Sequence, residues 1–141
     1  MRYLLDTNIF IAAMKGVETV QQRLEATPLS ALGLSPVVLG ELELGFEESV
    51  QREKNAARLQ GVVATLELVA LDDRVSRHDA AIRADLERKG TPIRANDDWI
   101  AAQGLALGAV VVTDNEYEFN RVSGLLVDNW RRPGGVGEDA D

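Results

Sequence analysis

The sequence predicts an α/β fold, a three-layer α/β/α sandwich in which helices cover both faces of a mostly parallel central sheet. Short apolar runs alternate with helical segments along most of the chain, which is typical of this class. The chain has 141 residues, 45% of them hydrophobic, which is enough for one core. No repeat or linker interrupts residues 1–132. We therefore predict one domain over residues 1–132, followed by a disordered acidic tail over residues 133–141.

The predicted strands are short apolar runs, most of them ending at a polar residue or a turn. In chain order they are residues 3–5, 32–34, 66–71, 109–113 and 125–127. The run 109–113 (AVVVT) carries the clearest signal because three consecutive valines favour a strand. Parallel strands need long crossover connections, and the helical segments between these runs can provide them.

Capping residues, prolines and glycines mark the predicted helix boundaries. Ser35 and Pro36 form an N-cap followed by a proline at the first helical position. Gly90 and Gly108 end two helices, and Asn96 is predicted to cap the second of these. The predicted helices span residues 9–14, 17–26, 36–46, 52–65, 72–89 and 97–107.

Composition excludes several kinds of chemistry. The absence of Cys removes disulfides, thiolate nucleophiles and cysteine-bound zinc. The single histidine, His78, removes two-histidine zinc sites and paired-histidine ribonuclease chemistry. The net charge of −8 argues against general nucleic-acid affinity, although bound cations would reverse the charge of an acidic cluster locally. With no signal peptide or apolar membrane span, we expect a cytoplasmic protein without membrane contact.

Acidic residues follow the ends of several predicted strands. Ligands of parallel sheets bind beyond the carboxyl ends of the strands, so these acids are expected to converge. Each has a plain structural explanation too; an acid in a first helical turn, for example, favourably meets the helix dipole. Asp6 is harder to explain in this way, because a carboxylate that ends a buried strand is costly unless it is paired or coordinated. The residues at this edge are Asp6, Thr7, Asn8, Glu41, Asp97, Asp98, Asp114, Asn115, Glu116 and Glu118.

Converging carboxylates without His or Cys favour Mg²⁺ or Mn²⁺. Such ions activate water for attack on phosphorus, so the predicted chemistry is phosphodiester or phosphoryl hydrolysis. A basic stretch precedes Asn96 and could contact a phosphate backbone or be a solvated helix face. It consists of Arg83, Arg88, Lys89 and Arg94. Trp99 and Trp130 are predicted to belong to the core.

Several segments share their order and spacing with one known family. They are residues 3–9, Ser35, residues 41–42, 89–93, 96–97, 100–102, 112–113, 118–119, 121–122, 124–125 and 129–130. Together they resemble the PIN-domain ribonucleases, specifically the VapC toxins of bacterial toxin–antitoxin pairs. The resemblance implies a PIN-like α/β/α sandwich and Mg²⁺-dependent endoribonuclease activity on tRNA or rRNA, with Mn²⁺ as a possible substitute. It also implies a homodimer that a small cognate antitoxin inhibits, with a hetero-oligomer of the two as a further possibility.

The resemblance also assigns roles within these segments. Asp6, Glu41 and Asp97 match the three principal acids. The matched or adjoining polar residues are Thr7, Asn8, Ser35, Asn96, Thr113 and Asn115. The fourth acidic position departs from the common pattern, since Asn115 stands where many PIN domains have Asp. Glu118 is our assignment there, with Asn115 and Asp114 left open, as is the choice between one and two ions.

Three other classes remain to be compared with this hypothesis. A haloacid-dehalogenase-like phosphatase would need a second Asp where this chain has Asn8. A receiver domain would need a Lys after the last acid-bearing strand, and residues 110–114 offer none. A PIN fold that serves only as a binding module would not need Asp6, Glu41 and Asp97 together.

Overall fold

The computed structural model describes residues 2–133, which form one five-stranded sheet with the order β3-β2-β1-β4-β5. Every strand pairing is parallel, which confirms and sharpens the predicted mostly parallel sheet. At the centre, Tyr3 of β1 pairs with Leu32 of β2 on one side and with Val110 of β4 on the other. The strands are β1 (Tyr3–Leu5), β2 (Leu32–Leu34), β3 (Glu67–Leu68), β4 (Val110–Val112) and β5 (Leu126–Asp128).

Helices connect all successive strands. Two short ones have no counterpart among the predicted helices: a single 3₁₀ turn, η1 (Leu29–Ala31), and α7 (Glu116–Phe119). The first helix begins at Thr7, two residues earlier than predicted, because the Asp6 side chain caps it. The others are α1 (Thr7–Met14), α2 (Glu18–Glu25), α3 (Pro36–Glu47), α4 (Arg52–Thr65), α5 (Asp73–Lys89) and α6 (Ala95–Leu107).

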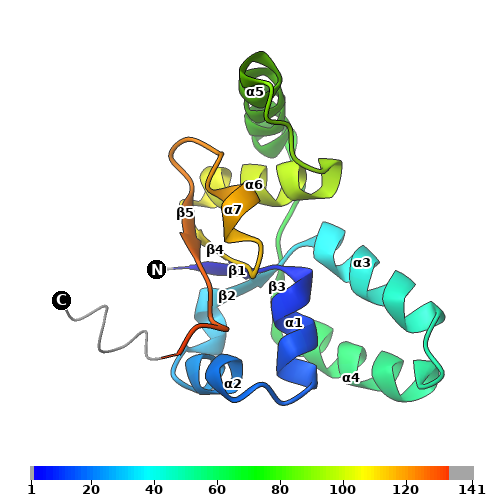
Figure 1. The fold of residues 1–141 in the computed structure, drawn as a ribbon. Helices are drawn as coiled ribbons and strands as arrows, with labels where there is room; N and C mark the ends of the chain where they lie inside the picture. The colour runs from blue at the N-terminus through cyan, green and yellow to red at the C-terminus, as the bar shows by residue number, and fades with distance from the viewer. Residues whose placement is uncertain (1, 134–141) are drawn as a thin grey trace.

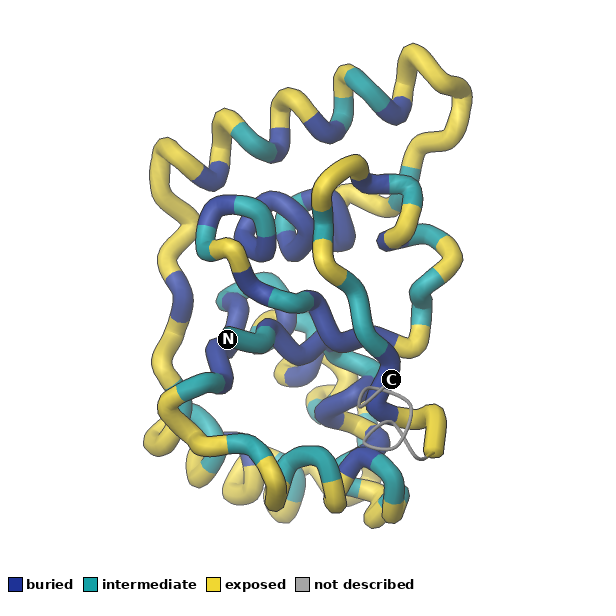
Figure 2. The backbone as a smooth tube through the Cα atoms, turned by 90° about the vertical axis from the view of Figure 1, so that its left-hand side faces the viewer, coloured by how far each residue is buried: buried dark blue, intermediate teal, exposed yellow. Residues whose placement is uncertain are grey.

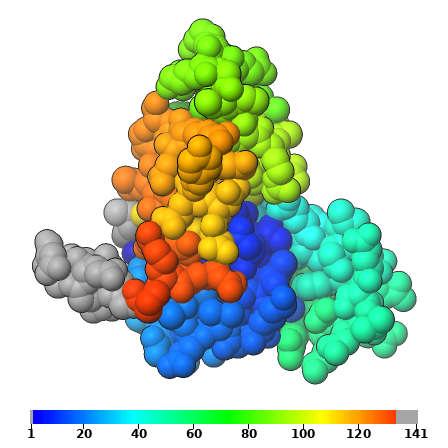
Figure 3. Space-filling model, in the orientation of Figure 1, coloured from blue at the N-terminus to red at the C-terminus, as the bar shows by residue number. Residues whose placement is uncertain are grey.

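The helices lie on both sides of the sheet, as the three-layer prediction requires. In Figure 1, α6 lies above the sheet with α5 outside it, and α1, α2 and α4 lie below. Figure 2 shows that most of α6 is buried after its exposed first two residues, whereas α5 buries one stripe and leaves most of its other residues exposed. Helices α3 and α4 project from the body as an arm, seen at the right of Figure 3.

The turn between α6 and β4 places the first turn of α6 beside the carboxyl end of β4. Gly108 has the left-handed φ of 63° that ends the helix, and the chain then reverses into the strand. Gly104 allows a close approach, since a Cβ there would lie 2.8 Å from Cγ2 of Val111 and 2.9 Å from Cδ1 of Leu125. The start of α6, with Asp97, therefore lies over the edge where β4 ends.

The third strand is shorter than predicted. The sequence predicted residues 66–71, but β3 contains only Glu67 and Leu68, both exposed at the edge of the sheet. Val69 still donates its N–H to the carbonyl of Leu34 at 2.8 Å. The Gln103 side-chain amide then donates to the carbonyls of residues 69 and 70, at 3.1 and 3.2 Å. The strand ends there because its partner β2 ends at Leu34, where Ser35 begins α3, and the Gln103 side chain satisfies the carbonyls that follow.

The two tryptophans differ in burial. Trp130 is 1% exposed and packs against the Tyr3 ring at 5.3 Å, which confirms a core position. Trp99 is only half-buried beneath the Arg83 guanidinium, so its prediction as a core residue is only partly right. Within residues 2–133, no helix has the length and apolarity that a membrane crossing requires. The predicted tail, apart from Pro133, lies outside the described residues.

Candidate active site

Asp6 joins the central strand to the first helix. Its N–H donates to the carbonyl of Val112 at 2.9 Å, which continues the pairing of β1 with β4. Its carboxylate accepts from the Thr7 N–H and the Thr113 hydroxyl, each at 2.8 Å, and from the Asn8 amide at 3.2 Å. The residue is 4% exposed, so a buried carboxylate is held in one orientation by three donors.

The electrostatic environment of Asp6 disfavours its negative charge. Burial raises the pKa of the Asp6 carboxyl, and the charges of Asp97 and Glu41 raise it further. The hydrogen bonds from Thr113 and Thr7 act in the opposite direction, since they stabilise the ionised form. A cation near this carboxylate would offset both the burial and the repulsion between acids.

Glu41 reaches this edge from α3. One of its oxygens accepts a short hydrogen bond from the Thr7 hydroxyl, and the other accepts from the Asn96 amide at 3.1 Å. The predicted capping role of Asn96 is therefore wrong: α6 begins at Ala95, with Arg94 at the N-cap position. The Asn96 amide instead contacts Glu41 and links α3 to the start of α6.

Asp97 lies in the first turn of α6 and is 1% exposed. The Arg94 guanidinium contacts its oxygens through Nε at 3.4 Å and Nη2 at 3.3 Å. Nη2 of Arg94 is also 3.5 Å from Oε2 of Glu41. Burial raises the pKa of the Asp97 carboxyl, Arg94 opposes this, and the charges of Glu41 and Glu118 raise the pKa further. A guanidinium thus stands between two of the predicted acids.

The four basic residues that precede Asn96 in the sequence do not form one cluster in the structure. Arg88 and Lys89 lie on α5 and pair with Asp85, at 3.8 and 2.9 Å. Arg94 alone among the four contacts the principal acids in the described part of the chain. The sequence left Arg94 as either part of a solvated helix face or a phosphate contact beside the site, and its pairing with Glu41 and Asp97 was not predicted. The contact with Asp97 lies within three residues of Arg94, whereas the contact with Glu41 joins segments 53 residues apart, and only this second contact lies beyond local pattern.

Three polar residues lie where the family pattern has its fourth acid: Thr113, Asn115 and Glu118. Thr113 is fully buried, donates to Asp6, and accepts the N–H of Asn115 at 2.9 Å. The Asn115 amide donates to Oε2 of Glu118 at 2.9 Å. Because the charge of Glu118 raises the pKa of Asp97, these two carboxyls are electrostatic neighbours. Thr113, Asn115 and Glu118 thus extend the hydrogen-bonded network of Asp6. This network, hereafter the acid network, consists of the four acids Asp6, Glu41, Asp97 and Glu118 and the polar residues that contact them, Thr7, Asn8, Arg94, Asn96, Thr113 and Asn115.

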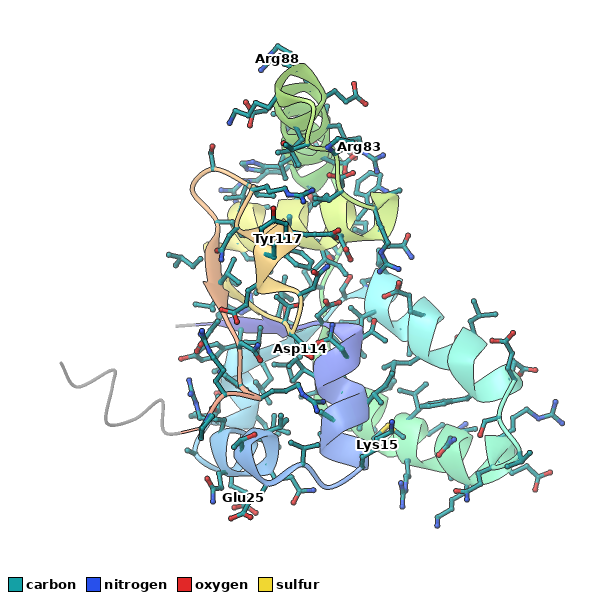
Figure 4. The ribbon with its side chains drawn as sticks, in the orientation of Figure 1. Lys15, Glu25, Arg83, Arg88, Asp114 and Tyr117 are labelled. Atoms are coloured by element: carbon teal, nitrogen blue, oxygen red, sulfur yellow. The ribbon has the colours of Figure 1, made fainter. Side chains whose placement is uncertain are left out.

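Asp114 points elsewhere. Its carboxylate accepts from the Asn129 amide at 3.1 Å and lies 3.6 Å from Nε of Arg131. Only its backbone joins the acid network, through an N–H donated to Asn8 at 2.9 Å. Figure 4 labels Asp114 in the segment that leads from β4 into α7.

Ser35 does not make a hydrogen bond to the acids in the described structure. Its hydroxyl accepts the N–H of Val37 at 3.1 Å and caps α3, as its sequence pattern predicted. The residue is buried, and it fixes the start of the helix that carries Glu41. Ser35 therefore supports the site indirectly.

Asp98 is buried but faces away from its neighbour Asp97, because consecutive helical residues point about 100° apart. It lies 3.7 Å from Arg83, which also contacts Asp79 at 2.8 Å between α5 and α6. Burial is the main cause that raises the pKa of Asp98 to about 6; Asp79 adds to the shift and Arg83 opposes it. These contacts give Asp98 a role in helix packing (Figure 4 labels Arg83).

The donor set fits a hard divalent cation. Among residues 2–133, no group of three acidic or histidine side chains is positioned to hold a metal ion in the arrangement observed, in which Arg94 stands between Glu41 and Asp97. The network nevertheless offers only carboxylate, hydroxyl and amide oxygens, the ligands that Mg²⁺ and Mn²⁺ prefer. Two of its acids also have pKa values raised by burial and mutual charge, which a bound divalent cation would offset.

A parallel sheet with acids gathered at its carboxyl edge is the arrangement expected of a metal-dependent nuclease of the PIN-domain class. Residues 3–125 match the PIN-domain family model, and the chain belongs to this family. Nucleases of this family generally use a divalent metal ion. The match favours neither the phosphatase nor the receiver alternative.

The relatives place the chain more closely, among the VapC ribonucleases. It is 36% identical over 131 residues to the tRNA(fMet)-specific endonuclease VapC of Salmonella typhimurium, covering 92% of this chain and 98% of that one. It is 33% identical over 132 residues to Ribonuclease VapC2 of Rickettsia felis, with the same coverage. The crystal structure of DNA-bound VapBC from Salmonella typhimurium superposes with a TM-score of 0.85 at 36% identity, covering 92% of this chain and 98% of that chain.

Proposed function

We propose that this protein is a Mg²⁺-dependent endoribonuclease, the toxin of a toxin–antitoxin pair, that hydrolyses phosphodiesters in tRNA or rRNA. The observation that carries the proposal is the meeting of Asp6, Glu41 and Asp97, from three separate elements, at the carboxyl edge of a PIN-domain sheet. Asp6, Glu41, Asp97 and Glu118 would hold the ion. When bound, the ion would make a water more acidic and stabilise negative charge that develops on the phosphate.

The polar neighbours of the acids prepare them for this task. Thr113 and Asn8 fix Oδ2 of Asp6. Thr7 and Asn96 fix the two oxygens of Glu41. Hydrogen bonds from the body of the domain already orient these carboxylates, so the main change that a cation requires is the withdrawal of Arg94 from between Glu41 and Asp97.

The substrate proposal is drawn from the relatives. The Salmonella protein is named a tRNA(fMet)-specific endonuclease, so initiator tRNA is the first substrate to test. An overall charge of −8 does not favour general RNA affinity, so binding must come from local cations and specific contacts. Arg94, beside the acids and exposed, is one such cation.

The partner proposal is a small cognate antitoxin. Solved structures similar to this chain include VapBC complexes, among them that of Rickettsia felis bound to a promoter DNA fragment. An antitoxin would block an acid pocket by presenting an Arg that competes with the metal. The contacts of Arg94 show that a guanidinium can stand between Glu41 and Asp97. We also propose a homodimer and, with the antitoxin, a hetero-oligomer.

The direct test is cleavage by purified protein freed of antitoxin. We expect initiator tRNA to be cut with Mg²⁺ or Mn²⁺, EDTA to stop the reaction, and the purified antitoxin to inhibit it. Expression of the toxin alone should arrest bacterial growth, and co-expression of the antitoxin should relieve the arrest. Undiminished cleavage in EDTA would contradict the metal mechanism, and harmless expression of folded protein would contradict the toxin role.

Arg94→Ala is expected to tighten metal binding. The substitution removes an exposed guanidinium that competes for Glu41 and Asp97, and because solvent screens its charge we expect the affinity to change by about two- to fivefold. Calorimetric titration of the metal-free protein with Mn²⁺ measures the change. Arg88→Ala on α5 is the matched control and should leave the affinity unchanged. Equal or weaker Mn²⁺ binding by Arg94→Ala would show that Arg94 does not compete with the ion.

A further inference from the structure

Tyr117 is an exposed aromatic residue that the fold does not use. Its side chain is 79% exposed, whereas Phe119 of the same short helix is fully buried. Figure 4 labels Tyr117 on α7, and Figure 3 shows that α7 forms part of the face turned toward the viewer. An exposed tyrosine presents the apolar face of its ring to a ligand, and the neighbours of Tyr117 show how that ring is held.

The ring is held in place by a neighbouring cation. The guanidinium of Arg121 lies 5.0 Å from the centre of the Tyr117 ring. Arg121 is itself anchored, because its Nη1 donates to the carbonyl of Pro92 at 3.1 Å. The Tyr117 ring and the Arg121 guanidinium therefore form a layered pair, hereafter the aromatic platform, fixed between α7 and the segment before α6.

Both residues of the aromatic platform are linked to chain segments that carry residues of the acid network. Tyr117 directly precedes Glu118, whose carboxylate accepts from Asn115 and raises the pKa of Asp97. Pro92 lies two residues before Arg94, which contacts Glu41 and Asp97. The Cα atoms of Tyr117 and Glu118 are about 3.8 Å apart, as for any consecutive residues, so a nucleotide next to a phosphate bound at Glu118 would lie beside the helix that carries the Tyr117 ring.

We propose that the aromatic platform stacks an unpaired base of the RNA beside the scissile phosphate. This inference rests on the proposed ribonuclease function and adds a specificity determinant to it. RNA-binding proteins stack unpaired bases on aromatic rings and on guanidinium planes, whereas a base inside a helix is already stacked on its neighbours. The platform therefore selects cleavage sites in loops or single strands. The tyrosine hydroxyl is not required, because the ring alone provides the stacking surface.

The test separates binding from chemistry with three variants. Tyr117→Ala should raise KM for initiator tRNA about tenfold, within the range expected for loss of one base–aromatic contact, and leave kcat nearly unchanged. Tyr117→Phe keeps the ring and should behave as the wild type. Val50→Ala, at a fully exposed position between α3 and α4, is the control for removal of an exposed side chain. The melting temperature of all three should equal that of the wild type.

An RNA probe lacking the stacked base completes the test. We would use an oligonucleotide that spans the mapped cleavage site, with an abasic nucleotide placed in turn on each side of it. At one position the abasic change should cost wild-type protein about as much as Tyr117→Ala does, and the two changes together should cost no more than either alone.

The outcomes separate the inference from the function on which it rests. Additive losses in the probe experiment, or a wild-type KM for Tyr117→Ala, would overturn the platform while cleavage by wild-type protein upholds the ribonuclease. If the wild type neither binds nor cleaves RNA, both proposals fall. A loss of antitoxin affinity without a loss of RNA affinity would overturn the base-stacking role and identify the ring as a protein contact.

Discussion

Asp6→Asn is expected to abolish metal-dependent RNA cleavage, with a loss of at least about a thousandfold in rate. The substitution removes the charge of a carboxylate that is 4% exposed and held by three donors, while it changes the side-chain volume very little. Without that charge, the remaining acids would hold a divalent ion too weakly to stabilise the reaction. Cleavage of initiator tRNA across a Mg²⁺ titration measures the effect.

Stability measurements would show whether the variant loses activity because it lacks a metal ligand or because it is unfolded. Because burial raises the pKa of Asp6, its ionised form costs folding stability at any pH above the ordinary Asp pKa. A neutral Asn avoids that cost but loses one favourable hydrogen bond, so the free energy of unfolding should change by less than about 1 kcal/mol. Mn²⁺ should raise the melting temperature of the wild type and not that of the variant. A variant that cleaves RNA normally would exclude Asp6 as a metal ligand.

Glu118→Ala is expected to weaken metal-dependent cleavage by about ten- to a hundredfold and to raise the Mg²⁺ concentration at half-maximal rate. Glu118 is an electrostatic neighbour of Asp97 and is oriented by Asn115. Asp114→Ala should have only a mild effect, because the Asp114 carboxylate is engaged by Asn129 and Arg131. Cleavage rates of both variants over the same Mg²⁺ series measure the difference.

A conservative variant separates charge from structure at this position. Glu118→Gln can still accept the Asn115 hydrogen bond but adds no negative charge. If the charge of Glu118 helps to hold the metal, Gln should be as damaging as Ala. Rescue of cleavage by Gln would make Glu118 a structural support, and a damaging Asp114→Ala with a near-neutral Glu118→Ala would reverse our assignment of the fourth acid.

Local features were the most predictable part of this chain. Ser35 and Pro36 start α3, and Gly90 and Gly108 end α5 and α6, as their conformational preferences predict. Asp6 could be singled out because a carboxylate at the end of a buried strand has few explanations other than pairing or coordination. These inferences succeed because capping and burial depend on residues close together in the chain.

Interactions between distant segments were mispredicted or missed. Asn96 fits a capping pattern, yet its amide contacts Glu41, 55 residues away in the chain. The predicted third strand ends early because its partner β2 ends at Leu34, and Gln103 of α6 satisfies the carbonyls that follow. In both cases the partner that a distant segment offers outweighs a local preference, because a strand needs a neighbour to pair with and a polar group gains from a fixed partner.

The sequence by itself determined the α/β class, the parallel sheet and the acids expected to converge at its carboxyl edge. It did so because hydrophobic period, caps and the chemistry of carboxylates are local properties. Only the tertiary structure decided that Arg94 stands between Glu41 and Asp97, that Asp98 faces α5, and that Glu118 and not Asp114 joins the acid network. The directions of these side chains depend on how α6 packs against β4 and α5, and that packing is the sum of many contacts between segments distant in sequence.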